Sequence, residues 1–478
     1  MSDFDRISKN SIYSFLSIFF RLFSNVILFW LIARFYGKEL FGQFTIAQTF
    51  ASVYVIFADF GLDMLLTIEI SRRLSDSTNI FRRYFSVKFV LVVIVFLILI
   101  GITFISNFSS DVRQLIIIFG FYGVFTTLTN FLYALFKGNE KLKYETKVSF
   151  FVNASSLIVL LPLIFLKQSI VVIAIIFVFM RLSGLLIALF FSFKILPTIS
   201  FKLDFSQFKE TWKKIIVFGL FLIFGNLYFQ LDTILLAYMV DNSSVGEYQA
   251  VFRLVMLPLI IPTIFVNSIM PALSRFNSQD IIKWEKLGYI LNKLLIIISI
   301  PISIILFVFA EQIISLIYGK AEYGPAIPIL KFFAVIVFIR FFAETFGLML
   351  TTSNRQKSRM IIVLVATIIN LVMNLILIPI YGIKGAAVTS LVTNLFVAIL
   401  FFIVTREISI SWLFRIFNPQ LLFAAAVVIL LSLILNETFL WYMVIIPLVL
   451  YFFYIYRFSL TIEERKYVSE LRFLRKRA

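Results

Sequence analysis

The sequence predicts an all-α integral membrane protein with about 14 transmembrane helices. Of its 478 residues, 61% are hydrophobic and 14% are charged, and the mean hydropathy is +1.03. Soluble domains carry roughly 45–50% apolar and about 25% charged residues, so no aqueous fold hides this much apolar surface. The apolar stretches are continuous and reach the ~20 residues that a helix needs to cross a bilayer. Strands of an outer-membrane barrel instead alternate apolar and polar residues.

Fourteen stretches fit a membrane-spanning helix. They lie near residues 12–33, 43–66, 86–106, 112–136, 148–166, 168–193, 213–238, 247–272, 289–310, 326–352, 359–379, 384–404, 419–435 and 438–458. The longest connections lie around 69–87, 195–212 and 273–288 and are short. They leave no room for a soluble catalytic domain, so we expect the protein to act within the bilayer.

The distribution of Lys and Arg predicts the orientation. With the N-terminus inside, 32 of the 43 Lys and Arg residues fall on inside segments and seven fall on outside segments. Lys88 and Lys293 are counted here among the inside segments. This bias follows the positive-inside rule and places both termini in the cytoplasm. The net charge of +18 is thus a topology signal, and no nucleic-acid partner is expected. The basic C-terminal tail, Arg472 to Arg477, is expected to rest on anionic membrane lipid.

The chain contains neither cysteine nor histidine. Disulfides, thiol nucleophiles and the usual zinc and iron–sulfur ligands are therefore excluded, and so is the commonest general base. We expect no catalytic residues, no metal site and no cofactor. The sequence also lacks a GxxxxGK[ST] motif, so no ATPase on this chain drives transport.

The chain repeats itself weakly. Gly42-Gln43-Phe44 opens the second predicted span and Gly246-Glu247-Tyr248 opens the eighth, an offset of 204 residues. The hairpin Lys137–Lys141 resembles Thr352–Gln356 at an offset of 215. These offsets favour two six-span halves of equal orientation followed by an extra pair of spans. Chance similarity of such short patterns is the alternative.

Several motifs together resemble one transporter family. They are Tyr36-Gly37-Lys38-Glu39-Leu40-Phe41-Gly42-Gln43-Phe44, Asp59-Phe60-Gly61-Leu62, Asp232 followed by Val245-Gly246-Glu247-Tyr248 and Met270-Pro271, and Pro379-Ile380-Tyr381-Gly382-Ile383-Lys384-Gly385-Ala386-Ala387. Over residues 1–405 their order and spacing are similar to those of Wzx-type polysaccharide flippases, within the multidrug/oligosaccharidyl-lipid/polysaccharide exporter superfamily.

The resemblance implies two six-helix lobes in a V around a central cavity. We place the lobes at residues 1–200 and 201–410, with two extra helices and the basic cytoplasmic tail at 411–478. In the lipid II flippases the extra pair shapes a groove for the lipid tail, but here residues 419–458 carry no motif that predicts one.

Four arginines lie within predicted spans: Arg21, Arg181, Arg253 and Arg340. A central Arg costs about 2.5–3.5 kcal/mol on insertion scales, so each needs a partner or a water-filled cavity. Arg21 continues a polar stripe with Ser14, Ser17 and Ser24. We expect these arginines to bind substrate, with Arg21 and Arg253 holding an anionic head group from opposite lobes. Structural pairing is the alternative, most strongly for Arg340, because Glu344 lies four residues later.

Four acids are candidates for ion coupling: Asp59, Asp63, Asp232 and Glu344. Asp59 and Asp63 are one helical turn apart, and their repulsion favours protonation of one of them, which suits coupling to H⁺ or Na⁺. Alternatively, Asp63 is simply solvated near the cytoplasmic boundary, and Asp232 pairs with Arg253. Polar stripes on spans 11 and 12 are expected to contact sugar hydroxyls or neighbouring helices. They comprise Thr367, Asn370, Asn374, Ser390 and Asn394.

These observations predict a flippase of the bacterial cytoplasmic (inner) membrane. Its substrate is a polyprenyl-pyrophosphate-linked oligosaccharide, such as an O-antigen or lipopolysaccharide repeat unit, moved by alternating access and coupled to H⁺ or Na⁺. Membrane lipids and other polysaccharide assembly proteins are the expected partners. A multidrug or organic-ion antiporter of the same superfamily is the closest alternative, and its usual cationic substrates would disfavour central arginines. A polysaccharide polymerase or ligase is a weaker alternative, because the outside loops are short and histidine is absent.

Overall fold

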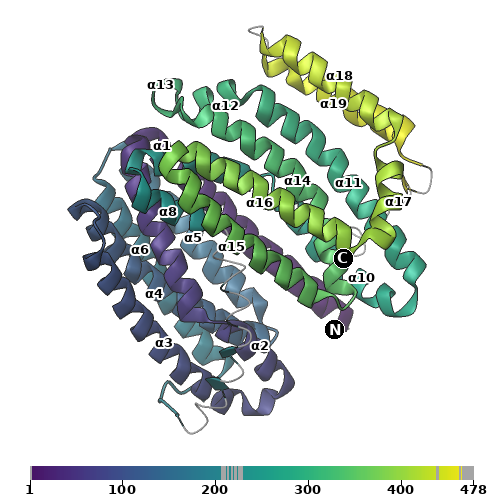
Figure 1. Ribbon diagram of the computed structural model, residues 1–478. Coiled ribbons are helices and arrows are strands. Elements are labelled where there is room, and N and C mark those ends of the chain that lie inside the picture. The colour runs from purple at the N-terminus through teal and green to yellow at the C-terminus, as the bar shows by residue number, and fades with distance from the viewer. Residues whose placement is uncertain are drawn as a thin grey trace. The chain divides into compact units, whose positions relative to one another are not determined.

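The computed structural model describes residues 3–205, 211–212, 215–216, 219, 223, 230–437, 441–461 and 464–465, with the backbone alone at 3–19 and at a few other helical positions. Helices make up its ordered elements (Figure 1). The chain divides into a first unit, Met1–Gln249, and a second unit, Ala250–Ala478. The expected lobe boundary near residue 200 and the V-shaped arrangement stay predictions.

The first unit is built around one long broken helix. It comprises α1 (Asp3–Asp59), α2 (Leu62–Arg72), η1 (Leu74–Asp76), α3 (Ser77–Ile105), α4 (Ser110–Gly138), α5 (Leu142–Phe165), α6 (Ile170–Ile195), α8 (Leu231–Met239) and the start of α9 (Asn242–Met256). Helix α1 packs on α4 and α5, and α4 packs on α2 and α6. Gly37 breaks α1 with φ 78° and ψ 172°, a conformation that glycine adopts without the Cβ penalty. The break separates the first two predicted spans.

The second unit is built around α14. It comprises the rest of α9, α10 (Ile260–Gln279), α11 (Ile281–Val308), α12 (Ala310–Ile317), α13 (Lys320–Tyr323), α14 (Ala326–Thr352), α15 (Gln356–Tyr381), α16 (Ile383–Val404), α17 (Arg406–Ile416), α18 (Pro419–Asn436), η2 (Trp441–Val444), α19 (Ile445–Tyr454) and η3 (Ile455–Ser459). Helix α14 contacts α11 and α16. Gly382, with φ 56°, lies in the motif that begins at Pro379 and makes the tight turn between α15 and α16.

Twelve segments within the described ranges are long and apolar enough to span a membrane. The first, Phe20–Arg72, covers the predicted span 12–33 from residue 20 onward and the whole of the predicted span 43–66. Half of the predicted span 213–238 lies outside the described residues. The tail residues Arg472, Arg475, Lys476 and Arg477 and the side chains of Ser14, Ser17 and Pro271 also lie outside them. The α-helical membrane fold predicted from the sequence is confirmed.

Two of the expected cytoplasmic loops are mostly helical. Helix α2 continues to Arg72 and α3 begins at Ser77, while α10 reaches Gln279 and α11 begins at Ile281. Asp280 caps α11 by accepting a hydrogen bond from the Lys283 backbone N–H at 3.1 Å. A hydrogen bond from the Lys283 side chain lowers the pKa of Asp280. Hydropathy finds where a helix enters the bilayer, but hydrogen bonds and caps decide where it ends.

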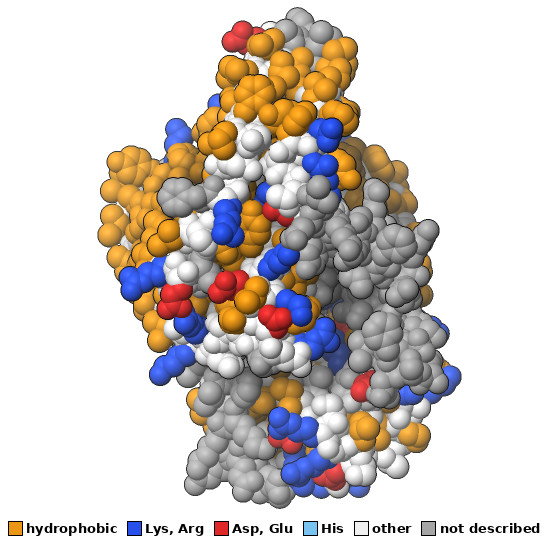
Figure 2. All heavy atoms as spheres, turned by 90° about the vertical axis from the view of Figure 1, so that its right-hand side faces the viewer, with side chains coloured by type: hydrophobic (Ala, Val, Ile, Leu, Met, Phe, Trp, Pro, Cys, Tyr) orange, Lys and Arg blue, Asp and Glu red, His pale blue; other side chains and the backbone are white. Residues whose placement is uncertain are grey.

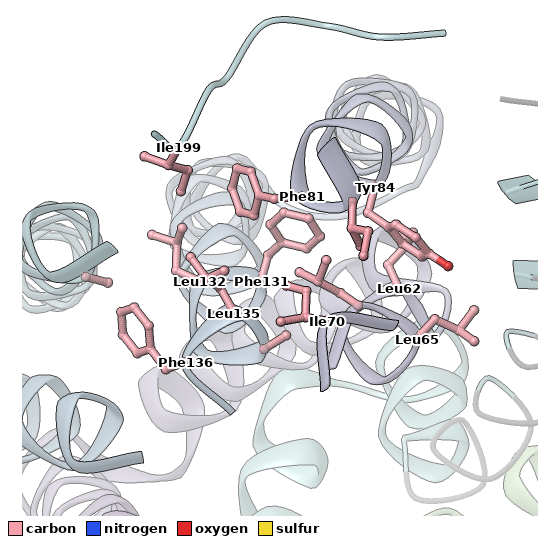
Figure 3. Packing of buried hydrophobic residues seen from close by; sticks show 14 of the residues in the cluster. Leu62, Leu65, Ile70, Phe81, Tyr84, Phe131, Leu132, Leu135, Phe136 and Ile199 are labelled. Atoms are coloured by element: carbon pink, nitrogen blue, oxygen red, sulfur yellow. The ribbon is translucent and has the colours of Figure 1, made fainter. Parts of the chain in front are cut away.

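Apolar side chains pack between α2, α3 and α4 and also cover the outside of the protein. Leu62, Ile70, Phe81, Phe131 and Leu135 belong to one buried cluster in the first unit (Figure 3). On the hairpin of α18 and α19, Phe423, Ile434, Ile445 and Phe453 are among the side chains that stay more than half exposed. Figure 2 shows a broad apolar area on one face, with Lys and Arg gathered apart from it. A lipid environment accounts for such exposure.

The first unit contains a reciprocal contact between the two repeated motifs. A Cβ atom on Gly42 would overlap the carbonyl oxygen of Asn242, and one on Gly246 would overlap the carbonyl oxygen of Lys38. The two glycines are 204 residues apart, and so are Lys38 and Asn242. A self-complementary contact of this kind is what a two-fold repeat produces, so it supports the duplication.

Candidate functional site

A polar cavity of about 310 Å³ lies within the first unit. Its walls come from α1, α4, α5 and α6, with Gln230 just before α8. The lining residues are Arg21, Asn25, Gln48, Ala51, Ser52, Val55, Ile56, Tyr122, Thr126, Thr129, Asn130, Tyr133, Ser149, Arg181 and Gln230. Ala51, Val55 and Ile56 are the apolar members of this set. In a chain this hydrophobic, so polar a lining needs a functional explanation.

Helical spacing directs these side chains to one place. On α1, Arg21 and Asn25 are one turn apart before the Gly37 break, and Gln48 and Ser52 are one turn apart after it. On α4, residues 122, 126, 130 and 133 follow at intervals of four, four and three. Residues at these intervals share one face of a helix. Because α1 and α4 pack together, their polar faces form a common wall.

Among the residues that the structure describes, the cavity is lined by two arginines and by no carboxylate. Arg181 is half-buried, and its guanidinium lies 5.0 Å from the ring centre of Tyr122, a cation–π distance. Arg21 is exposed and lines the same cavity from α1. Within the part of the chain that the structure describes, neither arginine forms an ion pair. Both guanidinium groups therefore keep hydrogen-bond donors for an anionic ligand.

Neutral polar groups surround the two arginines. The Gln48 side chain donates to the Ser52 hydroxyl at 3.1 Å, so their orientation is fixed locally. The Thr126 hydroxyl is buried and has no hydrogen-bond partner among the described residues. Such a group costs free energy unless a ligand or water binds it. Amides, hydroxyls and two tyrosines make a lining suited to the many hydroxyl groups of a sugar.

Arg253, Arg340 and Glu344 lie in the second unit. Arg253 is half-buried on α9 and acts electrostatically on Tyr318, whose hydroxyl donates to the Ala250 carbonyl at 3.0 Å. Arg340 and Glu344 are half-buried one turn apart on α14. The structure thus brings Arg21 together with Arg181, a pair not singled out from the sequence. The expected pairing of Arg21 with Arg253 stays a prediction.

The polar stripes of spans 11 and 12 are also found in the second unit. Thr367, Asn370 and Asn374 are buried on α15, and the Asn374 amide donates to the Asn370 side chain at 3.0 Å. On α16, the Asn394 amide donates to the Ser390 carbonyl at 2.8 Å. Much of their hydrogen bonding is therefore satisfied within their own helices.

Asp59 and Asp63 are bridged by Lys88, which the positive-inside count assigns to an inside segment. Lys88 lies on α3, and its Nζ is 3.1 Å from Asp59 Oδ1 and 3.0 Å from Asp63 Oδ1. Its side chain is 0% exposed. Asp63 is therefore not simply solvated. The signal available in the sequence was the position of Lys88 inside the predicted span, between Val87 and Phe89.

Asp232 lies on α8, where it is buried and accepts a hydrogen bond from the Tyr248 hydroxyl. Beside it, Lys38 and Glu247 form an ion pair at 2.6 Å. Both interactions join the segment of the repeated Gly246 motif to the rest of the first unit. The structure thus gives Asp232 a tyrosine partner, which was not expected from the sequence.

Two family models match the sequence. The family described as "Polysaccharide biosynthesis protein" matches residues 7–277, which is more than half of the chain. The family described as "MatE" matches residues 216–376.

Two similar proteins come from Haloferax volcanii. "Probable flippase AglR" is 27% identical over 171 residues, and "Probable low-salt glycan biosynthesis flippase Agl15" is 22% identical over 169 residues. Each match covers 35% of this chain and 35% of the relative. The chain thus spans about a third of the length of the curated relatives that it matches.

Two solved structures share the fold. "Lipid II flippase MurJ, inward closed conformation" is similar with a TM-score of 0.74 and 15% identity, over 93% of this chain and 97% of that chain. An inward-facing "multidrug resistance MATE family transporter of the MOP superfamily" is similar with a TM-score of 0.67 and 14% identity, over 82% of this chain and 95% of that one.

Proposed function

The chain belongs to the polysaccharide biosynthesis protein family, and on this premise we propose that it is a flippase for polyprenyl-pyrophosphate-linked oligosaccharides. One observation carries the proposal. Arg21 and Arg181 line a single polar cavity inside a membrane protein, and no carboxylate of the described part of the chain lines it with them.

The charge of the cavity suits a pyrophosphate. Arginine presents a planar fork of donors that binds phosphate oxygens in pairs, and such charge-assisted hydrogen bonds are stronger than neutral ones. The neutral amides and hydroxyls beside the arginines are suited to the first sugars. A multidrug antiporter, the alternative supported by the MatE match, usually has to attract organic cations. Two arginines without an acid would repel them.

The proposed cycle keeps the lipid tail in the bilayer while the head group enters the cavity. Rocking of the lobes then exposes the head group on the other side of the membrane. The exposed apolar side chains of α18 and α19 fit a lipid-facing role during this movement.

The proposed setting is the cytoplasmic membrane of a bacterium, with both termini inside. Reporter fusions after Lys9, near Ser278 and after Ala478 should report a cytoplasmic location. Fusions near Asn242 and Lys320 should report a periplasmic location. A periplasmic C-terminus would contradict the 14-span topology and the sidedness of the cycle.

The decisive experiment measures ligand binding by arginine variants. Purified wild type, Arg21→Ala and Arg181→Ala are titrated with polyprenyl pyrophosphate and with tetraphenylphosphonium as a cationic probe. A charge-assisted hydrogen bond contributes about 1.5–3 kcal/mol, so each variant should bind the pyrophosphate roughly 10- to 150-fold more weakly. Arg181→Lys keeps the positive charge but lacks the planar fork of donors, so its affinity for polyprenyl pyrophosphate should be intermediate.

Arg34→Ala is the matched control, because Arg34 lies on α1 like Arg21, is exposed and does not line the cavity. It should bind normally. Unchanged pyrophosphate affinity in both cavity variants at normal folding would reject the assignment of the anionic head group to this cavity. Tight tetraphenylphosphonium binding that increases when either arginine is removed would favour the multidrug alternative.

A further inference from the structure

A fully buried lysine is held between two carboxylates where α1 ends and α2 begins. Lys88 Nζ lies 3.1 Å from Asp59 Oδ1 and 3.0 Å from Asp63 Oδ1, and the Lys88 side chain is 0% exposed. The two carboxylates are 23% and 22% exposed. Water therefore reaches the acids, while the ammonium stays enclosed.

An aromatic ring of the apolar core also lies near the buried ammonium. Lys88 Nζ lies 5.6 Å from the ring centre of Phe131 on α4. Phe131 belongs to the buried cluster that also contains Leu62 and Tyr84, as Figure 3 shows. Within the described parts of the chain, the charged groups that act on each member of the cluster are the other two members. Tyr84, one turn before Lys88 on α3, is acted on by Glu69 of α2.

The two carboxylates have different partners. Asp59 also accepts hydrogen bonds from the backbone N–H groups of Gly61, at 3.3 Å, and Asp63, at 3.1 Å. These bonds favour its ionised form. They also fix the break between the helices, where Phe60 and Gly61 have φ of 46° and 81°. Among the described residues the Asp63 side chain accepts no such backbone bonds, so it is the better proton acceptor.

The charge of the cluster is unbalanced. One ammonium and two carboxylates sum to −1, and a buried net charge is costly in a low dielectric. Na⁺ prefers a shell of oxygen atoms, but the space between these two carboxylates is filled by the ammonium. A second cation there would be repelled by Lys88.

We propose that Asp59, Asp63 and Lys88 form the proton-exchange site of the transport cycle, with Lys88 occupying the place of a metal cation, so that the coupling ion is H⁺ and not Na⁺. This inference rests on the proposed flippase function. A proton from water binds a carboxylate oxygen of Asp63, and the ion pair between Asp63 and Lys88 is lost. The cluster becomes neutral, Lys88 stays paired with Asp59, and no electrons are transferred.

The first experiment tests ion preference without any transport substrate. Thermal unfolding of the purified protein is compared in NaCl and in choline chloride at equal ionic strength. We expect the wild type to have the same Tm in both salts. Lys88→Met leaves two carboxylates facing each other, so its Tm should be lowered in choline and partly restored by Na⁺.

Lys293→Met is the matched control. Lys293 is also buried, on α11, but it pairs with the single carboxylate of Glu464. The Tm of Lys293→Met should fall below that of the wild type by the same amount in both salts. A Na⁺-specific rise in the Tm of the wild type, or a Lys88→Met protein that does not distinguish the salts, would overturn the proposal.

The second experiment uses Asp63→Asn, which keeps the pair of Asp59 with Lys88 and should fold even where Lys88→Met does not. Flipping of the lipid-linked substrate into proteoliposomes is measured under a pH gradient and under a Na⁺ gradient. We expect wild-type flipping to respond to the pH gradient alone, and Asp63→Asn to lose that response while still binding polyprenyl pyrophosphate. A full response to the pH gradient in the variant would contradict the proposal. If the wild type flips no substrate under either gradient, the proposed function fails, and the melting series still decides which cation the cluster accepts.

Discussion

Lys88 in the first unit and Lys293 in the second occupy matching places in the two repeats and have different partners. They are 205 residues apart, close to the offset of 204 that relates Gly42 to Gly246. Each lies on a long helix, α3 or α11, and each is buried. Lys88 contacts two aspartates, whereas Lys293 donates to both oxygens of Glu464 at 2.9 Å and to the Ser459 carbonyl at 3.0 Å.

The Lys88 cluster can change its charge by binding a proton. For the Lys293–Glu464 pair such a change would cost much more free energy. Lys293 and Glu464 are balanced, and their side chains are 3% and 9% exposed. Glu464 is further held by the Thr461 backbone N–H at 2.7 Å, while the Thr461 hydroxyl accepts from the Glu464 backbone at 3.3 Å. This reciprocal pattern is a capping box. The pair therefore fastens the segment after α19 onto α11. The second repeat also lacks the two aspartates, because Thr263 and Asn267 stand 204 residues after Asp59 and Asp63.

The largest expected effect comes from breaking the balanced pair. Lys293→Met leaves Glu464 buried without its partner, which should lower the free energy of unfolding by about 3–5 kcal/mol. The double variant Lys293→Met with Glu464→Leu removes both charges and should recover most of this loss, since apolar replacements of a buried pair are often neutral. The measurement is unfolding of the purified protein in detergent.

The same neutralisation in the first unit should separate stability from transport. A triple variant with Lys88→Met, Asp59→Asn and Asp63→Asn should fold but flip no substrate, whereas the double variant at Lys293 and Glu464 should flip normally. If the double variant at Lys293 and Glu464 also abolishes flipping in well-folded protein, the proposed distinction between the two lysines is wrong.

The next effect concerns the contact that relates the repeats. Gly42→Ala and Gly246→Ala each place a methyl group against a backbone carbonyl, and such overpacking should cost about 1–3 kcal/mol of unfolding free energy. Because one shift of the helices relieves both clashes, the double variant should cost less than the sum. Gly101→Ala on α3 is the control, since a Cβ there meets nothing within 4 Å. Fully additive losses would argue against a shared contact.

Much of the fold was predictable because hydropathy and charge act locally along the chain. The spans, the Gly37 break and the tight turn at Gly382 all appear in the sequence. The polar face of Arg21 was also visible from its spacing, although its partner across the cavity was not. Arg181 lies about 160 residues away, and no periodicity connects the two.

The buried lysines show what hydropathy and charge along the chain do not reveal. Lys88 and Lys293 lie near the ends of predicted spans, where a positive charge normally contacts water and lipid head groups. If these two lysines are left out of the count, Lys and Arg still lie mainly on the inside segments. The topology could therefore be predicted without them. Their partners lie on other helices or beyond the last span, and only packing brings them together.

A smaller effect tests the break next to the Lys88 cluster. In the first repeat α1 and α2 separate at Gly61, with φ 81°, whereas α9 and α10 separate at Leu257–Leu259 around Pro258. Gly61→Ala must place a Cβ in the left-handed region, which costs about 1–2 kcal/mol. We expect a lower Tm together with altered flipping, because the break carries the backbone bonds to Asp59. An unchanged Tm would show that the break relaxes freely.

The smallest effect is expected at an exposed lysine pair. Lys320 and Glu311 form an ion pair in the second unit, with side chains 65% and 54% exposed. The hydrogen bond from Lys320 lowers the pKa of Glu311. Any stabilisation would therefore be present at neutral pH and lost as the pH falls through the folded pKa of Glu311.

Because exposed pairs are screened by water and salt, Lys320→Met should leave the Tm at pH 7 unchanged within error, in contrast to Lys293→Met. The check is a melting curve of both variants at pH 7 and at pH about 3, below the ordinary pKa of glutamate. A clear loss in Lys320→Met at pH 7 would mean that burial does not explain the difference between the lysines.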